Sequence, residues 1–255
     1  MPDLPLLWHF PISHYAEKVR WALDYKGIAH RRQVLSGDNV LRVRWATGRR
    51  STLPVLHLAG RAIVDSTDII AALEEHRPEP PLYPRDPAQR ERALALEDWL
   101  DEEVGHPVRT LLVPALMQQG PQRISDTLMS GMDSGTRRMF RLIHPIFRRF
   151  YFARHGIADA SRRAAPGIVQ GAFDRLAGEV GPSGYLVGDA FGVADLTAAS
   201  LLAPLVRPEG TLWAGLGTLP DEVERVLQPL TAHPVAEWVS EVYARHRGES
   251  AEVAH

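Results

Sequence analysis

The sequence predicts an α/β domain with a mixed sheet in residues 1–80, a linker at residues 81–87 and an all-helical domain in residues 88–255. In the first part, short apolar runs alternate with segments of helical spacing, which is typical of an α/β unit. Five prolines then crowd residues 77–87, too many for a helix or a central strand. Beyond them the apolar residues recur at helical spacing almost throughout.

The elements of the first domain follow from the period of its apolar residues. A short apolar run closed by a proline predicts a strand, and an apolar stripe that ends at a glycine predicts a helix. The strands are predicted at Leu6–Phe10, His30–Leu35, Val55–Leu58 and Ala62–Val64. The helices are predicted from Tyr15 to an end at Gly27, at Val40–Thr47, and around Ile69, Ile70 and Leu73. This order of elements indicates a mixed sheet.

Two apolar patterns stand out in the helical part. The first opens a long helix and consists of Leu94, Leu96, Trp99, Leu100 and Val104. The second consists of Met139, Ile143, Phe147 and Phe150, and we expect a helix that packs on this stripe and turns a basic face to solvent. That basic face would hold Arg137, Arg138, Arg141, Arg148, Arg149 and Arg154. A pocket for an acidic substrate is another interpretation of these arginines, and nucleic-acid binding is a third.

The composition excludes several classes of function. The 255 residues are 45% hydrophobic, which is ample for a buried core. A net charge of -2 gives no global attraction to nucleic acid or to an anionic membrane. The chain has no cysteine, so disulfides, thiolate metal sites and a cysteine nucleophile are excluded. The histidines lack metal-binding spacing, so no metal is expected, and without a leader or a long apolar run we expect a cytoplasmic location.

Ser13 lies where the first strand turns into the first helix. One interpretation is an ordinary N-cap, because a serine oxygen satisfies a free amide of the first turn. The other is chemical: a hydroxyl beside the positive end of a helix favours a nearby thiolate. Since the chain has no thiol of its own, that thiol would belong to a ligand.

Two further sites are ordinary when taken singly. Pro54 opens a strand, where its missing N–H is tolerated; a cis bond after Leu53 would leave the Leu53 backbone free to pair with an extended peptide. Asp65 and Ser66 precede a helix and fit a simple cap, but the same groups would also bind the carboxylate and ammonium of a ligand.

The order and spacing of these three sites resemble those of the soluble glutathione transferases. Ser-His-Tyr-Ala-Glu-Lys-Val-Arg at residues 13–20 is similar to the family's serine or cysteine motif, Thr-Leu-Pro-Val-Leu at 52–56 to its cis-proline motif, and Val-Asp-Ser at 64–66 to its glutathione-binding pair. Beyond the linker, residues 186–196 resemble the family's glycine turn and helix cap. Gly192 stands where that cap normally has a serine or threonine, and Asp195 is read as structural.

The resemblance implies a thioredoxin-like first domain that binds glutathione as co-substrate and a helical domain that binds an electrophile. Ser13 would hydrogen-bond the glutathione sulfur, Leu53 beside Pro54 would pair with the cysteinyl backbone, and Asp65 with Ser66 would hold the γ-glutamyl end. With serine in place of cysteine, conjugation or glutathione-assisted isomerisation of a hydrophobic electrophile is favoured over disulfide exchange.

Other properties of the family are expected by the same resemblance. They include a homodimer, a role in detoxification and a pocket for the second substrate. The residues expected near that pocket are His14, Tyr15, His106, Arg109 and Leu112. Two alternatives stay open, namely a glutathione- or ligand-binding protein without turnover and a structural interaction module of the same fold.

Overall fold

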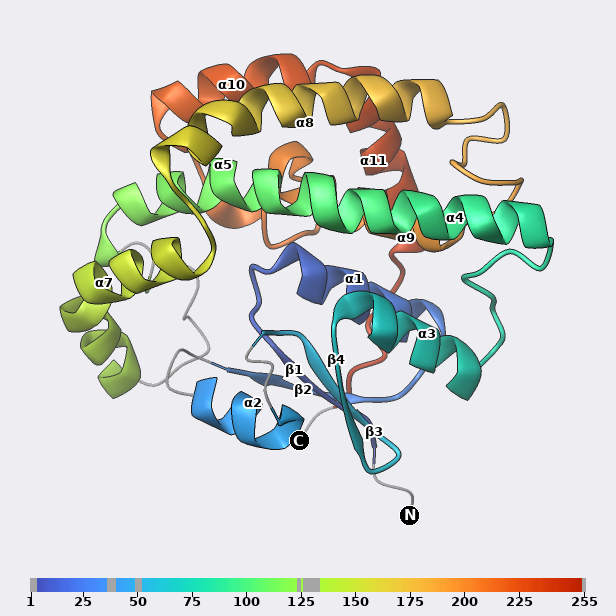
Figure 1. The fold of residues 1–255 in the computed structure, drawn as a ribbon, viewed down its shortest axis with the longest axis horizontal. Helices are drawn as coiled ribbons and strands as arrows, with labels where there is room; N and C mark the ends of the chain where they lie inside the picture. The colour runs from blue at the N-terminus through green and yellow to red at the C-terminus, as the bar shows by residue number, and fades with distance from the viewer. Residues whose placement is uncertain (1–3, 36–39, 49–51, 123–124, 126–133, 254–255) are drawn as a thin grey trace.

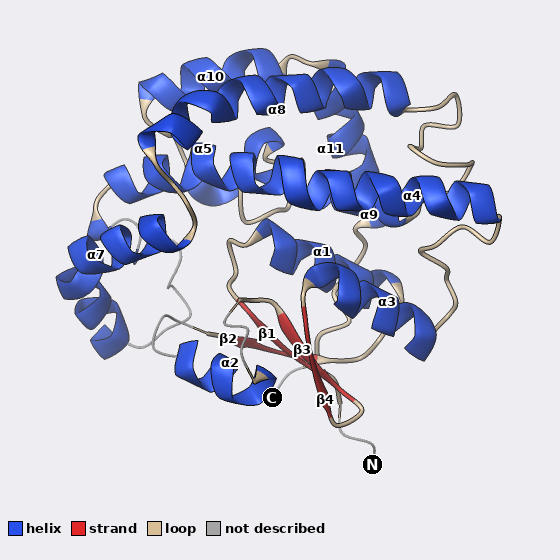
Figure 2. Cartoon of the chain, in the orientation of Figure 1, coloured by secondary structure: helices blue, strands red, loops and turns tan. Residues whose placement is uncertain are grey.

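The computed structural model describes residues 4–35, 40–48, 52–122, 125 and 134–253, which form a small sheet with helices on both faces and a larger helical layer beside it (Figures 1 and 2). The sheet has the order β2-β1-β3-β4. β1 runs parallel to β2 and antiparallel to β3, and β3 runs antiparallel to β4. This mixed sheet followed by helices confirms the predicted fold class. The strands are β1 (Leu6–His9), β2 (Arg31–Val34), β3 (Val55–Leu58) and β4 (Arg61–Val64).

Alternation along the strands gives each face of the sheet its own core. Leu7 and Leu56 point into the large core, together with side chains of α1 (His14–Tyr25) and α3 (Ser66–His76). Trp8 and Val55 point the other way and pack with Val43 of α2 (Val40–Thr47). α1 and α3 therefore lie between the sheet and the helical layer, and α2 covers the opposite face (Figure 1).

The helical layer is built around α9 (Val193–Val206), which is buried on every side. A helix that is apolar all round belongs in a core. α9 packs against α1, α4 (Pro87–Trp99), α5 (Gly105–Gln118) and α11 (Pro234–His246). The segment between His76 and Pro87 has neither helix nor strand, and the domain boundary at 81–87 stays a prediction. The other helices are α4 (Pro87–Trp99), a π-helical turn (Leu100–Val104), α5 (Gly105–Gln118), α7 (Ser134–Arg154), α8 (Asp159–Glu179), a 3-10 turn (Ala214–Leu216), α10 (Asp221–Thr231) and α11 (Pro234–His246).

The predicted burial of the α7 stripe is wrong for three of its four residues. Met139, Ile143 and Phe150 are exposed, at 58%, 43% and 58%. Phe147, the remaining residue of the stripe, is partly buried, and its ring lies 5.5 Å from that of Phe140, which the stripe did not include. The partly buried row therefore consists of Phe140, Phe147 and Tyr151 and shares only Phe147 with the predicted stripe. A helix with two apolar rows does not reveal from spacing alone which row faces the core.

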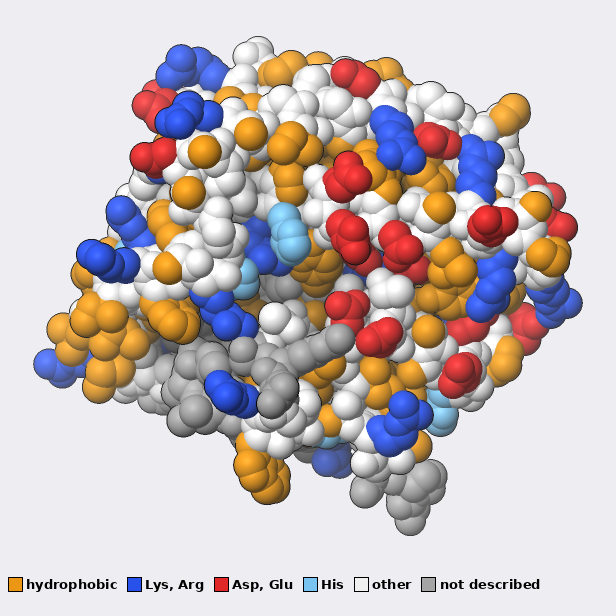
Figure 3. Space-filling view, in the orientation of Figure 1, with side chains coloured by type: hydrophobic (Ala, Val, Ile, Leu, Met, Phe, Trp, Pro, Cys, Tyr) orange, Lys and Arg blue, Asp and Glu red, His pale blue; other side chains and the backbone are white. Residues whose placement is uncertain are grey.

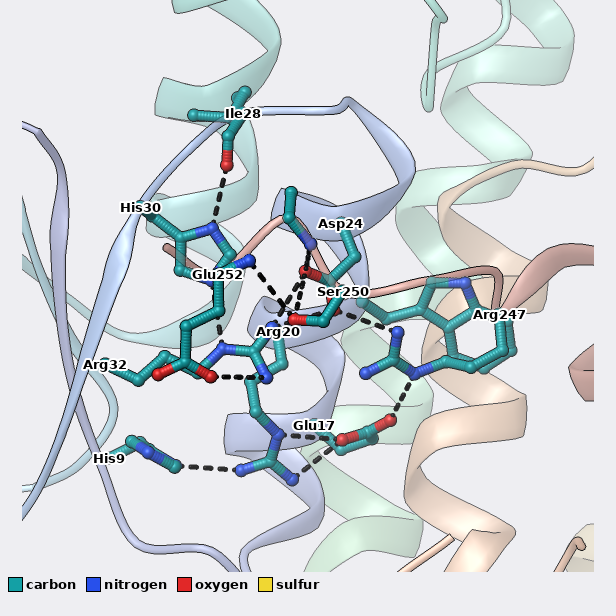
Figure 4. Close-up of polar contacts among 12 residues, drawn as sticks. His9, Glu17, Arg20, Asp24, Ile28, His30, Arg32, Arg247, Ser250 and Glu252 are labelled. Atoms are coloured by element: carbon teal, nitrogen blue, oxygen red, sulfur yellow. Dashed lines mark hydrogen bonds and ion pairs between the residues drawn. The ribbon is translucent and has the colours of Figure 1, made fainter. Parts of the chain in front are cut away.

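The chain after α11 returns from the helical layer to the sheet domain (Figure 4). His30 donates its N–H to Ala251 O (3.4 Å) and accepts from Val253 N (2.9 Å). The buried carboxylate of Asp24 accepts from Ala251 N and from the guanidinium of Arg247. Arg247 also donates to Glu17 Oε1 (2.7 Å), which ties α1 to this segment. The C-terminal segment therefore holds the two layers together.

Candidate active site

The register of the sheet brings the three predicted sites to one end. Trp8 of β1 lies opposite Val55 of β3, and Val55 lies opposite Val64 of β4. The chain leaves β1 toward Ser13, enters β3 from Leu53–Pro54 and leaves β4 into Asp65–Ser66. Because these three neighbouring strands begin or end at the same level, the three segments share one edge of the sheet.

Ser13 is the N-cap of α1, with extended backbone (φ -73°, ψ 121°). Its Oγ accepts a hydrogen bond from Ala16 N at 3.3 Å. A hydroxyl has one proton to donate as well as lone pairs that accept, so the cap leaves that proton available. The N-cap and the thiolate interpretation are therefore compatible in one side chain.

The peptide bond between Leu53 and Pro54 is cis, the isomer that the resemblance implies. Pro54 is buried and Leu53 is half-buried. Leu53 lies before β3, outside the ladder, and no residue in the described part of the chain hydrogen-bonds its backbone.

Asp65 caps α3 in an unusual backbone conformation. Its φ is +78°, a region that residues with a side chain rarely adopt. The carboxylate accepts from Thr67 N at 3.1 Å, while Ser66, the first residue of α3, is buried. Strain of this kind costs about 1–3 kcal/mol and tends to persist where a function needs the geometry. Asp65 is exposed and faces solvent beside the helix start.

A buried charge cluster underlies this edge, and the sequence analysis missed it. Lys18 Nζ lies 2.8 Å from Glu97 Oε1 and 2.6 Å from Asp101 Oδ2. Thr67, next to Ser66, donates to Asp101 Oδ2 at 2.8 Å. The Lys18 and Glu97 side chains are wholly buried. A lysine on the apolar face of a predicted helix was the only signal that could have indicated the cluster.

The carboxylates of Glu97 and Asp101 share the single cation of Lys18, and this sharing helps to set the direction in which the pKa values of Glu97 and Lys18 shift. Burial raises the pKa of Glu97, and Lys18 offsets this only in part. At Lys18 burial lowers the pKa, but Glu97 and Asp101 together outweigh it and the pKa is raised. Lys18 therefore stays charged, whereas ionised Glu97 is disfavoured.

Tyr15 is held by the turn that joins α4 to α5. Its hydroxyl donates to the carbonyl oxygen of Asp101 at 2.8 Å. A Cβ atom at Gly105 would overlap the Tyr15 hydroxyl, so this close approach requires glycine. Burial raises the pKa of Tyr15. Because its single proton is donated to Asp101, the Tyr15 hydroxyl has none left to donate to a ligand.

A cavity of about 330 Å³ lies between α5 and the segment that joins α7 to α8, and the predicted His106 and Arg109 line it. His106 lies with its ring centroid 6.3 Å from that of Tyr15, and the Arg109 guanidinium carbon lies 5.4 Å from the Tyr15 ring centroid. Two residues that line the cavity therefore lie beside the ring of Tyr15, which follows Ser13 by two residues in the first turn of α1. Figure 3 shows a hollow in the centre of this face, with histidine and Lys or Arg along one border and Asp or Glu along the other.

The other residues expected at this pocket lie outside its lining. His14 is buried with its ring centroid 4.5 Å from that of Tyr15. Burial, followed by the nearby Arg109, holds the pKa of His14 well below its usual range, so the ring is neutral. Leu112 packs in the main hydrophobic core. His155 does line the cavity, and spacing gave no sign of it.

Asp195 lies far from these groups in sequence and caps α9 from inside the helix. Its carboxylate accepts from Gly192 N at 3.0 Å and from Leu186 N at 2.8 Å. Burial raises the pKa of Asp195 to about 7 although both amides favour the charged form. Gly192 thus needs no side chain of its own at the cap, because Asp195 supplies the acceptor.

The part of the chain that the structure describes lacks two other kinds of feature. Within that part of the chain, no three His, Asp or Glu residues gather closely enough to hold a metal ion. Nor does any described helix combine the length and the apolar character that crossing a membrane requires.

Residues 7–81 match the family model of the glutathione S-transferase N-terminal domain. A protein of Nicotiana tabacum described as a probable glutathione S-transferase is 31% identical over 113 residues, 43% of this chain and 49% of that protein. The match thus spans about half of the relative's length.

Solved structures of the same architecture cover nearly the whole chain. The beta-etherase from Sphingobium sp. is 20% identical, with a TM-score of 0.64 over 96% of this chain and 97% of that chain. The maleylacetoacetate isomerase from Anaeromyxobacter dehalogenans, solved with glutathione in its active site, is 21% identical, with a TM-score of 0.56 over 95% and 91%. The chain therefore shares the fold of these solved structures, and its residues 7–81 match the N-terminal domain of the glutathione S-transferases.

Proposed function

We propose that this protein is a glutathione transferase that ionises the glutathione thiol at Ser13 and directs the thiolate to an electrophile. The observation that carries the proposal is the placement of Ser13, whose hydroxyl caps α1 and keeps its proton to donate, at the sheet edge that Leu53 and Asp65 share. Glutathione is the co-substrate and no metal takes part. The match to the transferase N-terminal domain over residues 7–81 supports the choice of ligand.

Each segment has a separate role in binding the tripeptide. The Leu53 backbone beside Pro54 pairs with the cysteinyl backbone, as an added strand would. Ser66 and the amides at the start of α3 bind the γ-glutamyl carboxylate, and Asp65 binds its ammonium group. These contacts bring the sulfur to the start of α1.

Ionisation of the thiol needs little energy. Lowering a thiol pKa by roughly two units takes about 2.7 kcal/mol, which one charge-assisted hydrogen bond and the end of a helix together supply. The thiol proton leaves to solvent. The thiolate then forms a carbon–sulfur bond with the electrophile, and either a leaving group departs or, in isomerisation, the sulfur is expelled again after rotation about the attacked bond.

Several finer properties rest on the resemblance and extend this proposal. We infer that residues 1–80 and 88–255 are separate domains, that the protein acts in the cytoplasm as a homodimer, and that it serves detoxification. The alternative function is a glutathione-binding protein without turnover; it would bind glutathione with the thiol pKa unchanged.

Calorimetric titration with glutathione tests the binding step, and a panel of electrophiles tests turnover. We expect wild type to bind and turn over, Ser13→Thr to retain both because the hydroxyl and the cap persist, and Ser13→Ala to bind glutathione but lose about 10- to 100-fold in turnover. Absence of any heat with wild type would contradict the proposal. Turnover that Ser13→Ala leaves unchanged would contradict the role of Ser13.

A further inference from the structure

The cavity beside α5 carries positive charge. None of its lining residues is acidic, and Arg109 and Arg154 both contribute to it. Burial, followed by Arg109, lowers the pKa of His155 to about 4, and the same two causes lower the pKa of His106. Both imidazoles are therefore neutral near pH 7, and the positive charge of the cavity comes from guanidinium groups.

Arg109 is held in place by contacts that do not neutralise it. Its Nη1 donates to His155 Nδ1 at 2.8 Å, and its guanidinium lies over the ring of Tyr15. No Asp or Glu among the described residues forms an ion pair with Arg109, which is half-buried. A guanidinium has five N–H donors, so most of them stay available. A partly desolvated cation of this kind favours an anionic partner with two oxygens.

We infer that this cavity binds the carboxylate of the second substrate through Arg109. The inference rests on the proposed function, since it names the class of electrophile that the transferase accepts. Pro107, Ala164 and Ile168 supply apolar surface to the same cavity. Its volume of about 330 Å³ lies in the range of small-molecule sites. The second substrate is therefore a small aromatic or aliphatic carboxylic acid.

His155 is a positioning residue in this site. Arginine has no hydrogen-bond acceptor, so the hydrogen bond between Arg109 Nη1 and His155 Nδ1 requires that Nδ1 carry no proton. This hydrogen bond fixes the orientation of the Arg109 guanidinium. The bond joins α5 to the residue just after α7, across 46 positions of sequence. His155 thus sets the angle at which Arg109 meets a carboxylate.

Binding of naphthoate, compared with its neutral analogue naphthamide, tests the inference by calorimetry. We expect wild type to bind naphthoate at least about tenfold more tightly, as a charge-assisted pair predicts. Arg109→Gln abolishes that preference. Arg163→Gln is the matched control, because it removes one exposed positive charge from the nearby helix α8 but does not line the cavity. Equal affinity of wild type for the two compounds, or an equal loss in both variants, would overturn the inference.

Two variants test the positioning role. His155→Asn keeps an acceptor close to the place of Nδ1 and should retain the preference for the carboxylate, whereas His155→Leu should lose it. A merely structural role would lower the melting temperature without changing the ratio of the two affinities. If both variants lose the tighter binding of naphthoate over naphthamide, or if neither loses it, the positioning role of His155 is contradicted.

The titrations are run with and without saturating glutathione. Carboxylate preference in protein that does not bind glutathione would leave the cavity assignment standing and overturn the transferase. If the protein binds glutathione but shows no preference for the carboxylate, the cavity assignment is overturned and the proposed transferase stands.

Discussion

Removal of the Lys18 amine should destabilise the protein in a way that depends strongly on pH. Lys18→Met leaves the carboxylates of buried Glu97 and half-buried Asp101 close together without a cation. One of them must then hold a proton in the folded state, because two like charges cannot both stay ionised there. Keeping a carboxyl of ordinary pKa 4.5 protonated costs about 1.36 kcal/mol for each pH unit above that value.

The expected cost of Lys18→Met is therefore up to about 4 kcal/mol at pH 7.5 and up to about 1.4 kcal/mol at pH 5.5, because the raised pKa of Glu97 already costs wild type part of this free energy. The sign follows from a carboxyl pKa that is raised on folding, since its contribution to stability is present at low pH and lost as the pH rises. Urea unfolding followed by circular dichroism measures the free energy at both pH values.

Glu97→Gln is the matched control for this experiment. It leaves Lys18 with one carboxylate, Asp101, at 2.6 Å, so it should cost far less and show no comparable rise with pH. A Lys18→Met variant that loses the same free energy at both pH values would refute the reasoning. So would a loss below about 1 kcal/mol at pH 7.5.

Two further predictions concern other buried groups. Asp195→Ala leaves the amides of Leu186 and Gly192 without their acceptor and should lower the free energy of unfolding by about 2–4 kcal/mol in urea titrations; a change under about 0.5 kcal/mol would contradict the cap. Burial, followed by Arg20, lowers the pKa of His9 from 6.5 to about 3, so its contribution to stability is lost as the pH falls through that window. Between pH 7.5 and pH 4.5 the free energy of unfolding should fall by about 2.7 kcal/mol more in wild type than in His9→Gln. If the two proteins lose the same free energy over this range, the lowered pKa of His9 is contradicted.

The spacing of the apolar residues predicted the helices and strands whose formation depends on interactions between residues close in sequence. The helix at Val40–Thr47 and the strand at Val55–Leu58 have the observed bounds, and the other predicted strand ends lie within a residue or two of the observed ones. The N-cap at Ser13 followed from the preference of helix ends for serine. Each of these features depends on neighbours only a few residues away.

Contacts between distant segments could not be predicted in the same way. Lys18 meets Asp101 across 83 positions and Arg109 meets His155 across 46, so neither pair leaves a periodic trace in the sequence. The choice of buried face on α7 fails for a related reason, since it depends on what the helix packs against. Local spacing therefore indicated the segments around Ser13, Leu53 and Asp65 that meet at one end of the sheet, but it did not reveal the charge cluster beneath them or the basic cavity beside them.

The central claim is that Ser13 and the start of α1 hold the bound sulfur as a thiolate. Ultraviolet thiolate absorbance of glutathione bound to the protein, followed against pH, measures this directly. The thiol should titrate roughly two pKa units below free glutathione in wild type and return most of the way to the free value in Ser13→Ala. A bound thiol that titrates like free glutathione in wild type would contradict the claim.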